Sequence, residues 1–201
     1  MRSVRKPELS AGGVWFGRCF LSSGAVFWLT LFCMLTSGRL MSAVLLSAAL
    51  HEGGHLCACR LFGVRVRAVR VTFCGAELLL EELRRPLQRL AVAAAGPGVN
   101  LLCAFAVALA FPQQAWAQLF AGASLILGLF NLLPIPPLDG GRILLSLLEL
   151  AGLGAGAEGA FHYLVTVLLV LALVPGVTLA LEGNLSLLLL VLWLLFQQRA
   201  A

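Results

Sequence analysis

Charged residues are scarce in this chain of 201 residues. Asp, Glu, Lys and Arg make up 11% of it and apolar residues 61%, whereas about 25% and about 45–50% are usual in soluble domains. Disorder requires high charge and low hydrophobicity, so this composition excludes it. It also argues strongly against a water-soluble globule, because too little polar surface is present to cover one. We therefore expect a multi-spanning membrane protein.

Lysine is nearly absent, and the net charge of +5 comes almost entirely from arginines. Because these arginines are scattered and not interleaved with aromatic residues, we do not expect a nucleic-acid partner. The six cysteines are spread through apolar stretches, which predicts reduced, buried thiols and no disulfide framework. The sequence shows no soluble domain, internal repeat or low-complexity linker.

Long apolar runs define the expected architecture, since a helix needs about 20 apolar residues to cross the core of a lipid bilayer. We predict one membrane-embedded domain over residues 1–201, an all-α polytopic membrane protein with about six transmembrane helices. The predicted spans are 19–38, 40–61, 90–111, 115–133, 159–181 and 184–198. Residues 140–158 are expected to form a short amphipathic helix and a flexible connection.

Arginine is concentrated on one side of this arrangement. Residues 60–89, between the second and third spans, hold seven arginines, and other basic residues precede the first span and follow the fourth and sixth. The loops on the opposite side carry only Arg39 and Glu182 as charged residues. The positive-inside rule therefore predicts cytoplasmic N- and C-termini.

One segment between the second and third spans nearly alternates apolar and basic residues. This pattern covers residues 64–73, is interrupted by Cys74-Gly75 and is followed by residues 77–80. It predicts a small interfacial β-hairpin, with an irregular basic loop on anionic lipid as the alternative. As an edge strand, residues 64–73 would be able to pair with an unwound substrate backbone.

Ionisable residues inside a membrane span are costly and therefore mark candidate functional sites. The second span contains His51, Glu52 and His55 together. Positions i and i+4 of an α-helix share a face, so both histidines can hold one metal ion while Glu52 reaches a water molecule beside it. This His-Glu-x-x-His pattern is typical of zinc peptidases, with two ligands and a general base. A polar contact between helices is the structural alternative.

Two histidines need a third protein ligand in such a site. Asp139 is the only aspartate of the chain and follows the fourth span, on the same predicted membrane side as the histidine pair. The prolines before it break the helix, and unwound backbone at membrane depth is tolerated where it lines a cavity. His162 begins the fifth span without a motif around it and is the weaker candidate. Cys57 and Cys59 are expected to be buried fillers, because positions i and i+2 do not share a helix face.

Three motifs, in matching order and spacing, resemble those of the site-2 proteases, a family of intramembrane zinc metalloproteases. They are His51-Glu52-Gly53-Gly54-His55, Ala95-Gly96-Pro97-Gly98-Val99-Asn100 and the segment Asn131 to Gly141, within a resemblance that covers about residues 40–145. The resemblance implies one Zn²⁺ per chain, bound by His51, His55 and Asp139, with Glu52 as the catalytic base.

Two asparagines of these motifs are further candidates. Asn100 and Asn131 are expected either to bind an unwound substrate backbone through hydrogen bonds or to mediate polar helix packing. Gly96-Pro97 is expected to shape the third span for close packing.

Within the family, the chain is most similar to the compact sporulation-type branch, the stage IV sporulation protein FB type, and we expect it to lack that branch's C-terminal CBS domain. The resemblance implies regulated proteolysis of membrane-spanning or membrane-associated protein substrates in a bacterial cell membrane, with regulatory membrane proteins as candidate partners. Two alternatives stay open, namely a catalytically silent membrane scaffold of the same fold and a divalent-metal transporter. The sequence does not specify the substrate, its cleavage site, the regulator or the oligomeric state.

Overall fold

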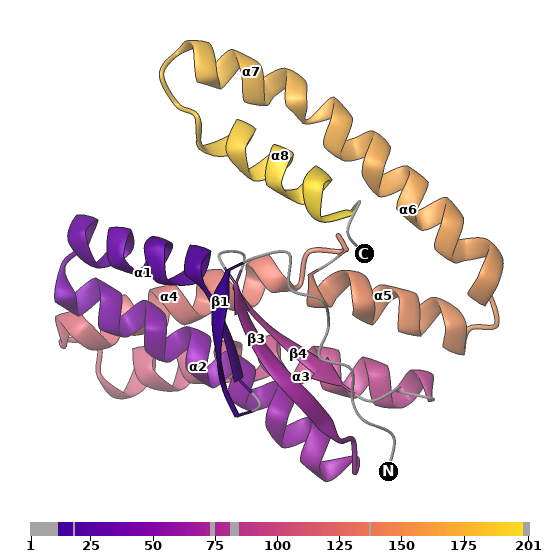
Figure 1. Ribbon diagram of the computed structural model, residues 1–201, viewed down its shortest axis with the longest axis horizontal. Coiled ribbons are helices and arrows are strands. Elements are labelled where there is room, and N and C mark those ends of the chain that lie inside the picture. The colour runs from indigo at the N-terminus through magenta and orange to yellow at the C-terminus, as the bar shows by residue number, and fades with distance from the viewer. Residues whose placement is uncertain (1–11, 18, 73–74, 81–84, 137, 199–201) are drawn as a thin grey trace.

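The computed structural model describes residues 12–198 except 18, 73–74, 81–84 and 137. Its elements are β1 (Gly13–Phe16), β2 (Cys19–Ser22), α1 (Ser23–Leu35), α2 (Gly38–Leu61), β3 (Val66–Thr72), β4 (Gly75–Leu80), α3 (Pro86–Ala110), α4 (Ala115–Asn131), α5 (Asp139–Leu150), α6 (Gly154–Leu171), α7 (Leu173–Leu181) and α8 (Ser186–Gln198). Helices α1 to α5 form one group, and α6 to α8 lie beside it as a second group (Figure 1).

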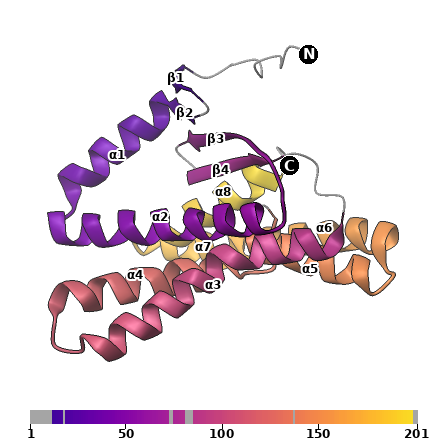
Figure 2. The same ribbon diagram turned by 90° about the horizontal axis from the view of Figure 1, so that it is seen from below.

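Helices α2, α3 and α4 pack against one another at the centre of the first group (Figure 2). Small residues line their contacts, which lets the helix backbones approach closely, as is common for helices in lipid. At Gly54 of α2, for example, an added Cβ would lie 2.6 Å from the carbonyl oxygen of Ala95 on α3. Glycine at this position is therefore required for the close approach of α2 and α3.

Two helical segments among the described residues are both long and apolar enough to cross a membrane, Pro86–Ala110 and Gly159–Leu181. Shorter apolar helices cover Ser23–Leu35, Ala115–Asn131 and Ser186–Phe196. Helix α2 has 24 residues, but the polar cluster at 51–55 lowers its mean hydropathy. The two apolar segments fit a membrane protein, and the count of six spans stays a prediction.

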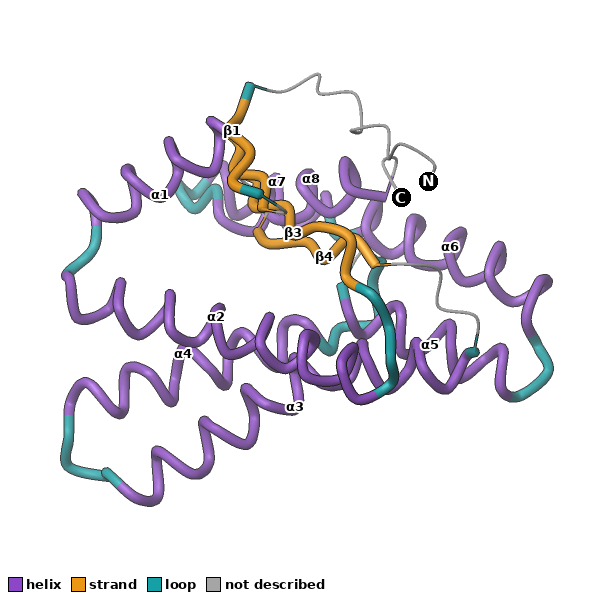
Figure 3. The backbone as a smooth tube through the Cα atoms, turned by 60° about the horizontal axis from the view of Figure 1, so that its bottom comes forward, coloured by secondary structure: helices purple, strands orange, loops and turns teal. Residues whose placement is uncertain are grey.

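The predicted hairpin between the second and third long helices is confirmed as the antiparallel pair β3 and β4. The sheet is larger than predicted, however, because a second hairpin, β1 and β2, joins it in the order β1-β2-β3-β4. The new contact is a parallel pairing of β2 with β3, in which Phe20 lies opposite Arg70. The strands lie beside α2, on the side away from α4 (Figures 2 and 3).

This topology corrects two predictions. The chain is not all-α apart from one hairpin, since residues 13–22 supply two further strands. Residues 64–73 do not provide an edge strand either, because β3 pairs with β2 on one side and with β4 on the other. Among the described residues, the free edges of the sheet belong to β1 and β4.

The helix of the predicted first span, 19–38, begins four residues later in the structure, at Ser23. Residues Cys19–Ser22 form β2, and the helix begins only at Ser23, where the Ser22 side chain accepts a hydrogen bond from the backbone N–H of Ala25. This is an ordinary N-cap, and it sets the helix start. Gly17, with φ of 63°, occupies the turn of the β1–β2 hairpin in a conformation that favours glycine.

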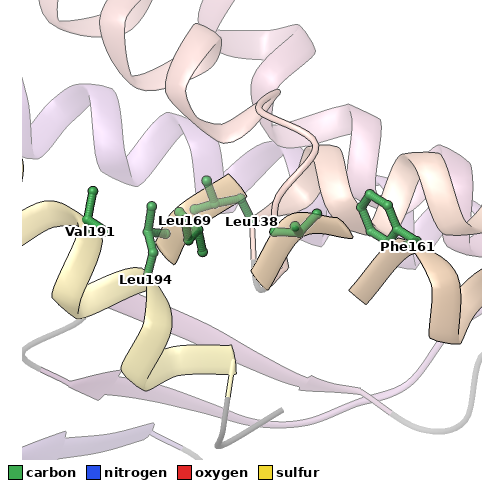
Figure 4. Close-up of a cluster of buried hydrophobic side chains, with 6 residues drawn as sticks. Leu138, Phe161, Leu169, Val191 and Leu194 are labelled. Atoms are coloured by element: carbon green, nitrogen blue, oxygen red, sulfur yellow. The ribbon is translucent and has the colours of Figure 1, made fainter. Parts of the chain in front are cut away.

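The predicted fifth span, 159–181, consists of two consecutive helices, α6 and α7, which meet at Ala172. Pro175 accounts for the break, since proline has no N–H to donate to the carbonyl four residues earlier. Helices α6 and α8 contribute to one cluster of buried apolar side chains: Leu138, Phe161, Val165, Leu169, Val191 and Leu194 (Figure 4). Leu138, which precedes α5, links this cluster to the first helix group.

Candidate metal centre

The two histidines of α2 lie on one buried face of the helix. His51 and His55 are separated by one helical turn, and their ring centroids are 4.8 Å apart in an edge-to-face arrangement. Their Nε2 atoms approach to 3.2 Å. Both rings therefore present the same nitrogen to one point.

Asp139, 84 residues beyond His55 in the sequence, completes this group. Its Oδ2 atom lies 3.1 Å from Nε2 of His51 and 3.2 Å from Nε2 of His55. All three side chains are buried. The carboxylate comes from the first residue of α5, so residues that are distant along the chain meet at one place.

Tight packing of the segment between α4 and α5 determines where Asp139 lies. An added Cβ on Gly140 would collide with the backbone of Leu132 and Leu133, and one on Gly141 would lie 2.7 Å from the backbone nitrogen of Pro136. The segment therefore folds back onto the first turn of α5, and both glycines after Asp139 are required. This explains the Asp-Gly-Gly sequence in physical terms.

The electrostatic environment keeps Asp139 ionised. Burial alone would raise the pKa of this carboxyl group, but the imidazole rings of His51 and His55 beside it lower the pKa to about 2. Asp139 is thus a carboxylate at neutral pH, which is the form that binds metal ions.

Residues of helix α3 contact the Nδ1 atoms of both histidine rings. Nδ1 of His55 lies 2.7 Å from the backbone carbonyl oxygen of Val92, and Nδ1 of His51 lies 3.4 Å from the amide nitrogen of Asn100. Between them, a Cβ added to Gly96 would collide with the ring of His55. Gly96 therefore serves close packing, as expected, and the neighbour that it accommodates is the histidine ring itself.

The other predicted residues differ in their placement. Glu52 is half-buried, and the charges of His51, His55, Asp139 and Arg142 all act on its carboxylate. It therefore lies beside the metal-binding group without belonging to it.

Asn131 is half-buried at the end of α4, where its side-chain nitrogen donates to the carbonyl of Leu127. His162 lies on α6, and Cys57 and Cys59 lie on α2; none of these three belongs to the group of possible metal ligands. Cys57 is exposed and Cys59 is buried, so the expectation of a buried thiol holds only for the latter.

The geometry of the three ligand atoms fits a zinc ion. Zinc–nitrogen and zinc–oxygen bonds of about 2.0–2.1 Å in a tetrahedron place neighbouring ligand atoms about 3.3 Å apart. The atoms of His51, His55 and Asp139 form a triangle with sides of 3.1 to 3.2 Å. This is one face of such a tetrahedron and leaves a fourth position available. The donor set of two imidazoles and one carboxylate matches catalytic zinc sites, which keep one position for water or substrate.

Sequence reasoning missed two parts of this site, namely the carbonyl of Val92 and the contact of Gly96 with His55. A backbone carbonyl is present at every residue, so the residue type of Val92 gives no signal for its role. The glycine was recognisable as a close-packing position, but its partner depends on how α2 and α3 pack.

Comparisons with known proteins show the family and the fold of the chain. The chain belongs to peptidase family M50, whose family model matches residues 40–119 and 113–174. It is also similar in fold to the site-2 protease of Methanocaldococcus jannaschii, with a TM-score of 0.70, 22% sequence identity and coverage of 94% of both chains.

Two curated relatives extend the comparison. The candidate zinc metalloprotease Rip3 of Mycobacterium tuberculosis is 37% identical over 70% of this chain. A zinc metalloprotease of Methanocaldococcus jannaschii is 26% identical over 64% of it. The alignments cover 42% and 37% of those proteins, so this chain spans about two-fifths of the length of these relatives.

Proposed function

We propose that this chain is an intramembrane zinc metalloprotease that hydrolyses peptide bonds in membrane-spanning or membrane-associated proteins. The observation that carries the proposal is the buried triangle of His51, His55 and Asp139 with Glu52 beside it. A metal site that served only stability would need a fourth protein ligand. Among the described residues, the group has three.

In this proposal, His51, His55 and Asp139 bind the metal ion, and Glu52 transfers protons. When bound by His51, His55 and Asp139, a zinc ion supplies Lewis acidity that polarises the scissile carbonyl and acidifies water. Glu52 takes the proton from the attacking water and returns it to the nitrogen of the leaving amine. Glu52 follows His51 directly on α2, and the charges of all three residues of the triangle act on its carboxylate. A general base must lie within hydrogen-bonding reach of the proton that it moves.

The substrate must present an unwound backbone, because a helix hides its amides in internal hydrogen bonds. The free edge of β4 offers backbone groups that an extended peptide can pair with, which is a common mode of peptide recognition. We assign this role to β4 in place of residues 64–73, whose strand is already paired on both sides. Asn131, near the same loop as Asp139, stays a candidate for contact with the substrate backbone.

The finer features of the proposal rest on the sequence. They are six membrane spans, cytoplasmic termini, a bacterial cell membrane, similarity to the sporulation-type branch, and a role in regulated proteolysis with membrane protein regulators as partners. The arginine distribution supports the orientation, and the three motifs support the assignment to the family.

Cleavage of a single-span reporter protein in liposomes tests the proposal. The full chain, Glu52→Gln and the matched control Glu182→Gln, whose residue is exposed in the turn between α7 and α8, are compared for zinc content and for cleavage. We expect one zinc in all three proteins and cleavage by the wild type and Glu182→Gln alone.

Each other outcome favours a named alternative. Zinc in all three proteins without any cleavage favours a silent scaffold. Zinc accumulation inside the liposomes favours a transporter. A folded wild type without stoichiometric zinc contradicts the proposal.

A further inference from the structure

The Nδ1 atoms of the two histidines in the metal centre face different kinds of group, a backbone carbonyl and a side-chain amide. Nδ1 of His55 lies 2.7 Å from the carbonyl oxygen of Val92. A backbone carbonyl can only accept, so the ring proton of the neutral His55 imidazole sits on Nδ1. Its Nε2 therefore presents a lone pair to the candidate metal position.

His51 faces a side chain instead. Its Nδ1 lies 3.4 Å from the amide nitrogen of Asn100, which can only donate. In this arrangement Nδ1 accepts, and the proton of His51 sits on Nε2, where it points to the Asp139 carboxylate 3.1 Å away. A ring in this tautomer has no lone pair on Nε2 for a metal ion.

The oxygen atom at the other end of the same amide shows how the His51 tautomer can be reconciled with metal binding. Oδ1 of Asn100 is buried and has no hydrogen-bond partner among the described residues, and the residue as a whole is 0% exposed. The oxygen and nitrogen ends of a side-chain amide have nearly the same shape, so either end can face His51. A half-turn of the amide exchanges its oxygen and nitrogen, so that Oδ1 accepts the Nδ1 proton of His51. The lone pair of Nε2 then faces His55 and Asp139.

We propose that Asn100 is a positioning residue of the metal centre, whose side-chain oxygen accepts the Nδ1 proton of His51 and keeps Nε2 free for the metal. This inference rests on the proposed zinc site and adds a residue to it. Acceptors behind metal-binding histidines fix both the tautomer and the orientation of the ring.

This role replaces the substrate contact predicted for Asn100 from the sequence. The residue is fully buried on α3, and a Cβ added to Gly128 of α4 would lie 3.3 Å from its Cβ, so α4 covers it closely. Because His51 lies directly against the Asn100 amide, a substrate backbone would have to displace that ring to reach it.

Zinc affinity of the full chain in detergent, measured by competition with a chromogenic chelator, tests the inference. Asn100→Leu removes the acceptor at similar size, and Asn100→Asp keeps an acceptor. Ser124→Ala is the matched control, because Ser124 is an equally buried polar residue of the neighbouring helix α4. We expect affinity about 10–100-fold weaker for Asn100→Leu and close to wild type for the other two variants.

Other results overturn the inference in distinguishable ways. Wild-type affinity of Asn100→Leu contradicts it directly, and equal weakening by Leu and Asp shows that Asn100 acts through packing. If the leucine variant does not fold, Asn100→Ala takes its place. The visible spectrum of the cobalt-loaded alanine variant must then differ from that of cobalt-loaded wild type, and an unchanged spectrum refutes the role. A wild type that binds no zinc refutes the proposed function as well.

Discussion

The two helix groups of this protein bury different kinds of residue. Every buried polar or charged side chain among the described residues lies at or before Ser146, and His51, Asn100 and Asp139 are at the centre of the first group. The buried side chains of α6 to α8, among them Phe161 and Leu194, are apolar. The candidate metal ligands thus lie on α2 and α5, and the buried side chains of the second group pack through apolar contacts.

This difference has a physical consequence for a protein in lipid. Lipid tails are as apolar as leucine, so apolar packing between helices gains little from the hydrophobic effect, and polar contacts and close backbone approach contribute specificity. We therefore expect the substitutions that change the metal centre to lie in the first group, and those in the second group to change stability alone. Leu138 belongs to the apolar cluster and precedes Asp139, so it couples the cluster directly to the segment that carries Asp139.

The largest expected effect on zinc content and cleavage comes from removing a candidate metal ligand. Asp139→Ala should lose stoichiometric zinc and all cleavage, because two imidazoles alone do not form a zinc site of the usual kind. His162→Ala, in the second group, should keep both. Zinc content by elemental mass spectrometry of the purified proteins checks this, and zinc retained by Asp139→Ala would contradict the ligand assignment.

A smaller but still large effect on zinc affinity is expected from substitution of Gly96. Its Cβ would collide with the ring of His55 in Gly96→Ala, and overpacking of this kind costs about 1–3 kcal/mol. We expect zinc affinity to fall at least about tenfold as the ring is displaced. Gly98→Ala, on the same helix but with open space for a Cβ, is the control; equal affinity of the two variants in a chelator competition would refute the steric argument.

Substitutions in the apolar cluster test the coupling through Leu138. Leu194→Ala should lower the melting temperature in detergent without changing zinc affinity, whereas Leu138→Ala should lower both. In water-soluble cores such truncations cost about 2–5 kcal/mol, and the cost should be lower here because the driving force in lipid is weaker. A change of zinc affinity in Leu194→Ala would show that the two groups are not separable.

The smallest effect is expected for the ion pair of Arg89 on α3 with Glu149 on α5. Both side chains are about two-fifths exposed, at 39% and 42%, and such pairs contribute about 0.2–1 kcal/mol. A double-mutant cycle with Arg89→Ala and Glu149→Ala, followed by thermal unfolding, should give a coupling energy in this range. Loss of zinc from either variant would mean that this pair helps to set the position of α5.

The residues with chemical roles could be predicted from the sequence, because the i and i+4 spacing of His51 and His55 has a fixed meaning on a helix. Asp139 stood out as the only aspartate, next to a break in a helix. That these three residues meet follows from the structure, and their roles as ligands stay a proposal.

Other features depend on packing and could not be predicted in this way. Residues 19–22 are apolar and uncharged, so they read as the start of a membrane span, and no local signal indicates that β2 pairs with β3 about fifty residues later. Asn100 was recognised as a polar site residue, but whether it faces substrate or His51 depends on how α3 packs against α2.

X-ray absorption of the zinc-loaded wild type is the sharpest test of the proposed metal centre. We expect one zinc per chain with only nitrogen and oxygen ligands, two of them imidazoles, at about 2.0–2.2 Å. A sulfur ligand at about 2.3 Å, which would implicate a thiolate such as Cys57 or Cys59, or a folded protein without stoichiometric zinc, would contradict it.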